Sequence, residues 1–169
     1  MRYPEIAREL LAMERVDQEM RGRQLKEPDY WDDVDRRHTR RMAEIVIRIG
    51  WPTVSKVGDE ASHAAWLLVQ HADHDVVFQR ACLSLMKLME SASETGITEV
   101  RRSDIAYLED RVRVNLGKPQ LYGTQFMEVD GRFVSWEIEN PEEVNKRRLQ
   151  MGLGTLEDGI LEMYEKYPD

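Results

Sequence analysis

Apolar residues recur every three or four positions over several long stretches of the chain, which is the spacing of one face of an α-helix. Glycine and proline separate these stretches, and neither residue readily continues a helix. In the first stretch the apolar face comprises Ile6, Leu10, Met13 and Val16. The pattern predicts helices over about residues 3–20, 31–49, 59–72, 73–91, 103–116, 141–149 and 155–164.

The third and fourth stretches are apolar on most sides, which is typical of helices at the centre of a bundle. The third is rich in alanine, and three of the four histidines lie in it or just after it. We expect the two either to form one helix with a kink near Asp73 or to be separate helices, the second capped by Asp73. Together they predict the hydrophobic spine of the fold.

The periodicity changes at residues 120–138, where β-type alternation replaces the helical spacing. Asp130-Gly131 divides this segment, and an Asp-Gly pair suits the positive φ angles of a tight hairpin turn. Two strands need a surface to pack on. We therefore predict a mainly α, single-domain helical bundle over residues 1–169, with six or seven helices and one small β-hairpin at about 120–138.

The composition indicates a globular protein, because 41% of the 169 residues are hydrophobic and 33% are charged. No apolar run is long enough to span a membrane, so a soluble protein is expected. The first residues lack the apolar stretch of a signal peptide, and the single Cys82 has no partner for an internal disulfide. These features predict a cytoplasmic protein, with Cys82 as a small buried side chain.

The formal net charge of −8 opposes nonspecific binding of nucleic acid. Two short basic clusters remain, and acidic residues flank both at helical spacing. We interpret them as ion-paired, solvated helix faces. Their members are Arg36, Arg37, Arg40 and Arg41 in the first cluster and Lys146, Arg147 and Arg148 in the second.

Histidine titrates near neutral pH, so His63, His71 and His74 are candidates for acid-base chemistry. On a regular helix they share one face. Asp73, Asp75 or Asp110 could then orient His71. An alternative is a metal site formed by His71 with His74 or Asp75, and a structural alternative is that the histidines bond partners at a helix end.

A second group of polar residues lies between the predicted helix 103–116 and the hairpin. Asp110 could orient a histidine, and the forked guanidinium of Arg111 suits an anionic group. Tyr122 and Gln125 flank Gly123 in a segment that could line a small-molecule pocket. Interhelical salt bridges and a solvent-facing hairpin are the structural alternatives, and a solvated face is the default for Asp17, Gln18 and Arg21.

Four short motifs occur in order along the chain, preceded by Asp17-Gln18 and Arg21: Gly50-Trp51-Pro52-Thr53, Gln70-His71-Ala72-Asp73, Asp110-Arg111-Val112 and Tyr122-Gly123-Thr124-Gln125. With them, most of the chain resembles a bacterial family catalogued as a domain of unknown function, number 6624. The resemblance implies no particular activity. It does imply that Trp51, His71, Asp73, Asp110, Arg111, Tyr122 and Gln125 belong to the family pattern.

The leading hypothesis is a small enzyme that uses His71 as general base or acid on a small polar or anionic metabolite, as a hydrolase, lyase or isomerase. Asp73 and Asp110 complete the expected catalytic set, and the expected substrate-binding residues are Trp51, Arg111, Tyr122 and Gln125. No cofactor and no metal ligand is expected in this hypothesis. Its alternatives are a non-catalytic binding or immunity-type module, and a metal-dependent enzyme using His71 with His74 or Asp75. A small-molecule ligand is the expected partner, without nucleic acid or membrane, and a protein partner or a homo-oligomer is left open.

Overall fold

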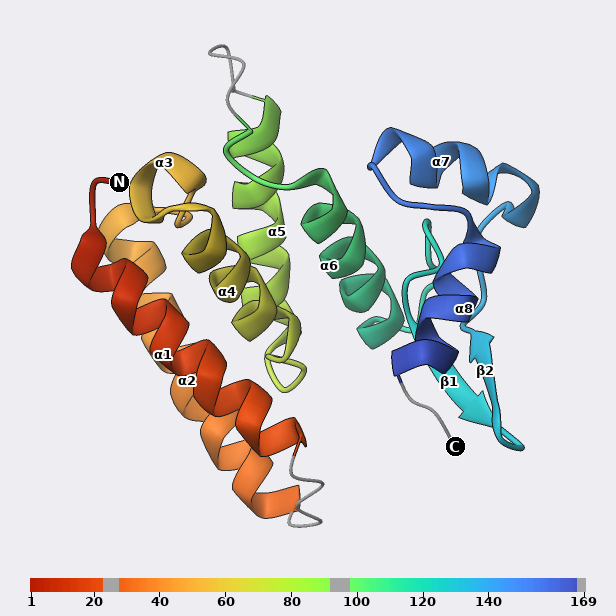
Figure 1. The fold of residues 1–169 in the computed structure, drawn as a ribbon, viewed down its shortest axis with the longest axis horizontal. Coiled ribbons are helices and arrows are strands. Elements are labelled where there is room, and N and C mark those ends of the chain that lie inside the picture. Colours follow the sequence, from red (N-terminus) through yellow and green to blue (C-terminus); the bar gives the residue numbers. More distant parts are fainter. Residues whose placement is uncertain (23–27, 92–97, 167–169) are drawn as a thin grey trace. The chain divides into compact units, whose positions relative to one another are not determined.

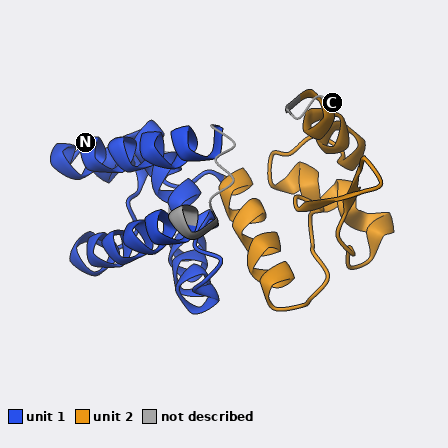
Figure 2. Ribbon diagram, turned by 90° about the horizontal axis from the view of Figure 1, so that it is seen from below, with its two compact units in different colours: residues 1–101 blue, residues 102–169 orange. Residues whose placement is uncertain are grey.

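The computed structural model describes residues 1–22, 28–91 and 98–166, and their contacts group the chain into two compact units (Figure 2). Unit 1 is Met1–Arg101 and unit 2 is Arg102–Asp169. The structure is mainly helical with a single two-stranded hairpin within the described ranges, which confirms the predicted fold class. The prediction of one domain over residues 1–169 stays a prediction.

Unit 1 is a group of packed helices in which α1 and α2 run antiparallel as a long helical hairpin (Figure 1). Helix α4 packs against both of them, and α5 packs on α4. Among the described residues no helix is both long and apolar enough to cross a bilayer. The helices of unit 1 are α1 (Pro4–Gly22), α2 (Pro28–Ile49), α3 (Val54–Val57), α4 (Asp59–Gln70) and α5 (Val76–Ser91).

Glycine and proline end α2 where the sequence indicates. Gly50 takes a φ of 69°, a conformation that costs little without a Cβ, and its N–H donates to the carbonyl of Val46 at 2.9 Å. Pro52 then prevents continuation of the helix. The ammonium of Lys56 donates to the carbonyl of Trp51 at 3.0 Å and also to that of Ile49. This turn is thereby fixed to the end of α2.

The third predicted helix stops earlier than expected, and Asp73 is not the cap of the next helix. Helix α4 ends at Gln70, residues 71–75 form a turn, and α5 begins at Val76. Asp75 provides the cap, because its Oδ1 accepts the N–H of Phe78 at 2.9 Å. The common face predicted for the histidines therefore fails at His74, which lies exposed in the turn.

Unit 2 combines helices with the hairpin, and α8 packs against β2 (Figure 1). Its elements are α6 (Arg102–Asn115), β1 (Phe126–Val129), β2 (Arg132–Ser135), the 3₁₀ turn η1 (Pro141–Glu143), α7 (Val144–Gln150) and α8 (Leu156–Lys166). Thr155 and Asp158 cap α8 reciprocally: the Thr155 N–H donates to the Asp158 carboxylate at 2.8 Å, and the Asp158 N–H donates to Thr155 Oγ1 at 3.2 Å.

The hairpin turns at the predicted residues but has shorter strands than predicted. Asp130 and Gly131 have φ angles of 50° and 71°, and Val129 pairs with Arg132 across the turn. Residues 121–125, expected in the first strand, form a loop instead. The alternation of side chains predicted for a strand therefore does not apply to Tyr122 and Gln125.

Candidate functional site

A carboxylate lies on the buried face of α1, where the sequence pattern predicts apolar residues. The buried residues Ile6, Leu10, Asp17 and Met20 follow one stripe of the helix, and Asp17 has no exposed surface. Val16, predicted on the apolar face, is 44% exposed. The interpretation of Asp17 as part of a solvated face is therefore wrong. A buried carboxylate requires hydrogen-bonding partners.

The principal partner of Asp17 is His71, the residue that follows the last turn of α4. Asp17 Oδ1 lies 2.8 Å from His71 Nδ1, and the His71 side chain is 18% exposed. At this distance two lone pairs would repel each other, so Nδ1 carries the hydrogen and donates it to the carboxylate. Nε2, on the opposite side of the ring, has no hydrogen-bond partner within the described part of the chain.

Arg21 connects this pair to α2. Its Nη2 donates to both oxygens of Asp35, at 2.8 and 3.0 Å, and its Nε lies 3.3 Å from Asp17 Oδ1. The same Nε is 3.1 Å from His71 Nδ1, but a nitrogen that donates to Asp17 cannot also accept. Arg21 therefore acts as the counter-ion of two carboxylates.

The charges of this cluster keep Asp17 ionised in spite of its burial. Burial alone raises the pKa of Asp17, but the hydrogen bond from His71 and the positive charge of Arg21 hold the pKa below its ordinary value of 3.8. The pKa of Asp35 is raised, because the effect of burial is larger than the opposing effect of the Arg21 charge. An anionic Asp17 is the state that accepts a hydrogen from His71.

The other two predicted site residues of unit 1 are Asp73 and Trp51. Asp73 is exposed in the turn after α4, and its Oδ1 accepts from Gln79 Nε2 at 3.3 Å. The same Nε2 donates to the carbonyl of Val69, so this contact of Asp73 supports the turn between α4 and α5. Trp51 is 1% exposed and belongs to the buried core. The catalytic role of Asp73 and the binding role of Trp51 stay predictions.

In unit 2, Asp110 holds the loop that precedes β1. Its carboxylate accepts the backbone N–H groups of Leu121 (2.7 Å), Tyr122 (3.1 Å) and Thr124 (3.0 Å), together with the Thr124 hydroxyl at 3.0 Å. Asp110 has no exposed surface. Burial raises its pKa, against the effect of these hydrogen bonds. The bonds explain why residues 121–125 are a loop, because a carboxylate takes the amide hydrogens that a strand would donate.

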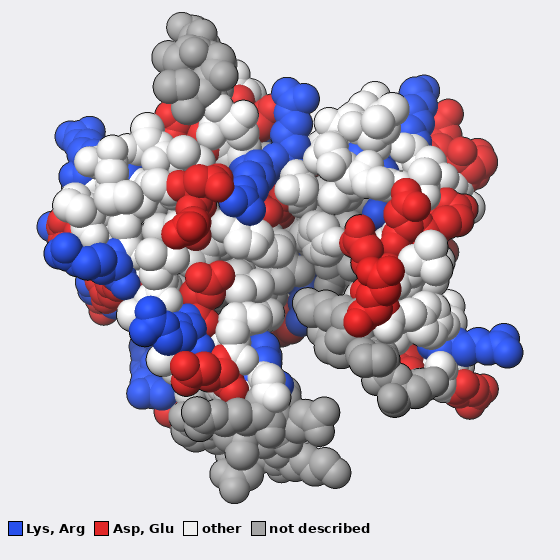
Figure 3. All heavy atoms as spheres, viewed as in Figure 1, with Lys and Arg blue, Asp and Glu red and all other residues white. Residues whose placement is uncertain are grey.

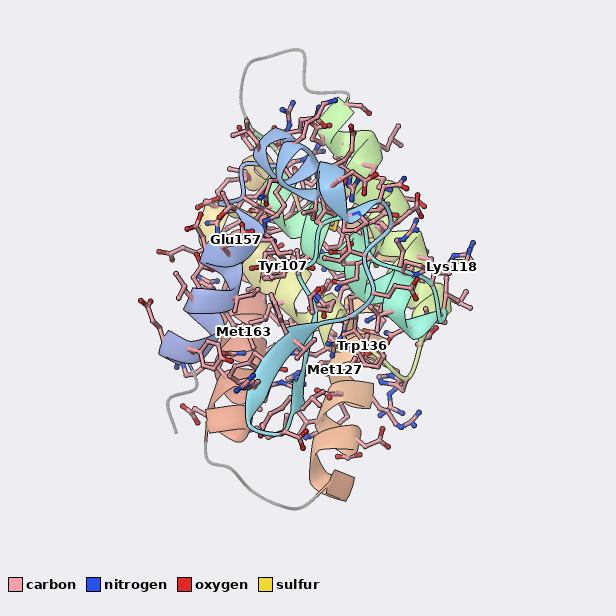
Figure 4. The ribbon with its side chains drawn as sticks, turned by 90° about the vertical axis from the view of Figure 1, so that its right-hand side faces the viewer. Tyr107, Lys118, Met127, Trp136, Glu157 and Met163 are labelled. Carbon is pink, nitrogen blue, oxygen red and sulfur yellow. The ribbon has the colours of Figure 1, made fainter. Side chains whose placement is uncertain are left out.

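The remaining predicted residues belong to the same loop network. Arg111 Nη1 donates to Gln125 Oε1 at 3.0 Å, and Gln125 is itself buried. Tyr122 is half-buried, and burial raises the pKa of its hydroxyl. Figure 4 faces the hairpin and α8 of this unit, with Met127 labelled on β1 and Met163 on α8. The predicted roles of Asp110, Arg111, Tyr122 and Gln125 in catalysis and binding remain predictions.

The basic cluster of α2 forms the expected ion pairs, whereas Arg147 and Arg148 of the α7 cluster have other partners. On α2, Arg36 pairs with Asp32 at 2.7 Å and Arg37 with Asp33 at 3.2 Å, which confirms ion-paired faces there. Arg148 is instead 4% exposed, and it donates to the carbonyls of Tyr122 (2.9 Å) and Gly154 (2.6 Å). Arg147 donates to the carbonyl of Leu121. These two arginines are structural groups of unit 2, since their donors are occupied by backbone oxygens.

Charges of both signs are interspersed on the face of unit 1 shown in Figure 3, whereas acidic side chains gather on the face of unit 2. Helix α8 contributes to this acidity through Glu157, Asp158, Glu162 and Glu165. Across residues 1–22, 28–91 and 98–166, no group of three or more His, Cys, Asp or Glu side chains has an arrangement that could hold a metal ion.

A family model described as "Family of unknown function (DUF6624)" matches residues 4–168, and the chain belongs to this family. Neither the curated proteins nor the solved structures contain a match to the chain.

Asp17 was the functional candidate that the sequence interpretation placed on the wrong side of its helix. The available signal was its position: residues 6, 10, 13, 17 and 20 recur at spacings of three and four, so Asp17 continues the apolar stripe. A charged residue on such a stripe is rarely buried without a partner. That partner, His71, is identifiable only in the folded chain.

Proposed function

We propose that the protein is a small enzyme that uses His71 as a general base and acid on a small polar substrate. The observation that carries the proposal is the 2.8 Å hydrogen bond between Nδ1 of the half-buried His71 and the fully buried carboxylate of Asp17. Hydrolysis, elimination and isomerisation all use such a proton transfer, and the proposal covers these three reaction types.

The orientation of the His71 ring gives its two nitrogens different roles. With its hydrogen on Nδ1, neutral His71 has a lone pair on Nε2 that can accept a proton from a substrate or from water. The resulting imidazolium keeps its hydrogen bond to Asp17, whose negative charge stabilises it. Transfer of the Nε2 proton to a leaving or product group then restores neutral His71.

Asp17 takes the orienting role for which Asp73 and Asp110 were predicted. Asp17 is the carboxylate bonded to His71, whereas Asp73 accepts a hydrogen bond from Gln79, and Asp110 accepts hydrogen bonds from the loop at 121–124. Arg21 supports this assignment, because its positive charge favours the ionised form of Asp17. Trp51, Arg111, Tyr122 and Gln125 are not needed for proton transfer, and the proposal assigns them no part in it.

The test is a turnover screen of polar esters, amides, phosphoesters and hydroxy acids, followed by matched variants. His71→Asn should lower kcat by about 10²- to 10⁴-fold, the usual contribution of a general base. Asp17→Asn should lower kcat in the same direction, because the ring loses its anionic partner. His74→Asn is the control, since His74 is exposed in the neighbouring turn and should keep the wild-type kcat.

A screen in which no compound is turned over would favour the alternative, a non-catalytic binding module. Turnover that is unchanged in His71→Asn, with the variant folded by circular dichroism, would contradict the proposal. Turnover lost equally in His71→Asn and His74→Asn would also contradict it, because the effect would then not depend on the bond to Asp17.

A further inference from the structure

A second imidazole lies on the face of α2 that carries Asp35. His38 is one helical turn after Asp35, and residues three apart lie on the same side of a helix. His38 also falls on the buried stripe of α2, between Val34 and Met42, both of which have no exposed surface. Its ring is therefore directed to the interior of unit 1 and not to the ion-paired surface of the helix.

The pairing of α1 with α2 puts His38 level with Asp17. The two helices are antiparallel (Figure 1), and the ion pair of Arg21 with Asp35 joins them at one level. Because the helices are antiparallel, the residue one turn after Asp35 on α2 lies level with the residue about one turn before Arg21 on α1. Asp17 is the residue one turn before Arg21. The same two carboxylates, Asp17 and Asp35, act electrostatically on His38.

The Nδ1 atom of His38 is enclosed and makes no hydrogen bond with any described residue. Buried polar atoms are nearly always bonded, so an exception within a polar cluster needs an explanation. Burial lowers the pKa of His38, and the positive charges of Arg37 and Arg21 lower it further. The negative charges of Asp17 and Asp35 raise it, but by less. The lowered pKa favours the neutral form of the His38 ring, which lies within the electrostatic reach of Asp17.

We propose that His38 is a substrate-binding residue of the Asp17–His71 site, whose ring makes a hydrogen bond to a polar group of the substrate while His71 transfers the proton. This inference rests on the proposed function. It assigns to the unpaired Nδ1, which is enclosed in the free protein, a partner that reaches this atom only when substrate binding opens the enclosure. It also predicts a trade-off, because a group kept unpaired for binding lowers the stability of the free protein.

The first arm of the test is stability, which needs no substrate. Replacing the ring with an apolar side chain removes the unpaired atom, so His38→Phe or His38→Leu should raise Tm by about 2–4 °C. Phenylalanine has a helix propensity similar to that of histidine, and leucine is the smaller choice if phenylalanine overpacks the site. A lower Tm in both variants would overturn the proposal, since His38 would then be a bonded or tightly packed core residue.

The second arm measures the hydrolase, lyase or isomerase activity found in the turnover screen. His38→Leu should raise KM about tenfold, the loss expected for one hydrogen bond, and change kcat less than His71→Asn does. His38→Asn should restore most of the binding, because its amide occupies the position of Nδ1. Unchanged KM in His38→Leu with kcat lost in His71→Asn would overturn the role of His38 and leave the proposed function standing. Unchanged kcat in His71→Asn would overturn both.

Discussion

Asp17 Oδ1 and His71 Nδ1 lie 2.8 Å apart, although 54 positions separate the two residues in the sequence. Asp17 comes from the buried stripe of α1, and His71 comes from the end of α4, which packs against α1. Their bond joins a side chain without solvent contact to one that is partly exposed. The proposed chemistry of the protein depends on this bond.

The first prediction concerns the pH dependence of stability at Asp17. Its pKa in the folded protein is lower than the ordinary value of 3.8, so ionised Asp17 stabilises the fold above that value, and this stabilisation is lost as the pH falls through the folded pKa. Tm measured from about pH 7 down to about pH 2 should therefore fall more steeply for the wild type than for Asp17→Asn. Asp33→Asn, at an exposed ion pair of α2, is the control and should follow the wild type. Parallel curves for the wild type and Asp17→Asn would contradict the prediction.

The second prediction concerns Arg21, the counter-ion of Asp17 and Asp35. Arg21→Met leaves two neighbouring carboxylates without this cation, and the free energy of unfolding should fall by about 1–3 kcal/mol, the usual range for hydrogen bonds to charged groups. Arg37→Met removes an exposed pair with Asp33 from the same helical hairpin. It should cost less than about 0.5 kcal/mol. Urea unfolding of both variants provides the comparison, and equal costs would show that the Arg21 bridge adds nothing beyond a surface pair.

The third prediction separates a structural from a catalytic role of Asp110. Asp110→Ala removes the acceptor of the Leu121, Tyr122 and Thr124 amides, so hydrogen exchange at these three amides should accelerate by at least about tenfold. Asp130→Asn is the charge-matched control, because Asp130 is exposed in the hairpin turn and asparagine tolerates its positive φ. Exchange that is unchanged in Asp110→Ala would show that the loop is held by other groups.

The fourth prediction compares two glycines that have nearly the same φ, 65° at Gly123 and 67° at Gly117. A Cβ at Gly123 would lie 2.8 Å from side-chain carbons of both Ile138 and Leu156, whereas a Cβ at Gly117 would meet nothing within 4 Å. Both alanine variants should lose about 1–2 kcal/mol from the positive φ. Gly123→Ala should lose about 1–3 kcal/mol more from overpacking. Thermal unfolding would give the difference, and equal losses would refute the close contact at Gly123.

The sequence pattern was sufficient for the long helices α1 and α2 because their determinants are local. Helical spacing marks α1 and α2, and Gly50 and Pro52 mark the end of α2. The Asp130-Gly131 turn was equally predictable, because the positive φ angles are a property of those two residues.

The sequence pattern failed where a distant side chain determines the local structure. Residues 121–125 alternate as a strand does, but the Asp110 carboxylate binds their amides and makes them a loop. The orienting partner of His71 was expected at Asp73 or Asp110, which are near His71 in the sequence or share the motif pattern. Asp17 is instead brought to His71 by the packing of α1 on α4, which no local pattern specifies.

Every residue of the proposed proton-transfer cluster comes before Ala72, namely Asp17, Arg21, Asp35 and His71. During translation the ribosome therefore synthesises all four residues before it reaches the first residue of α6. The order of synthesis allows the imidazole to meet its carboxylate while the codons for the hairpin are still unread.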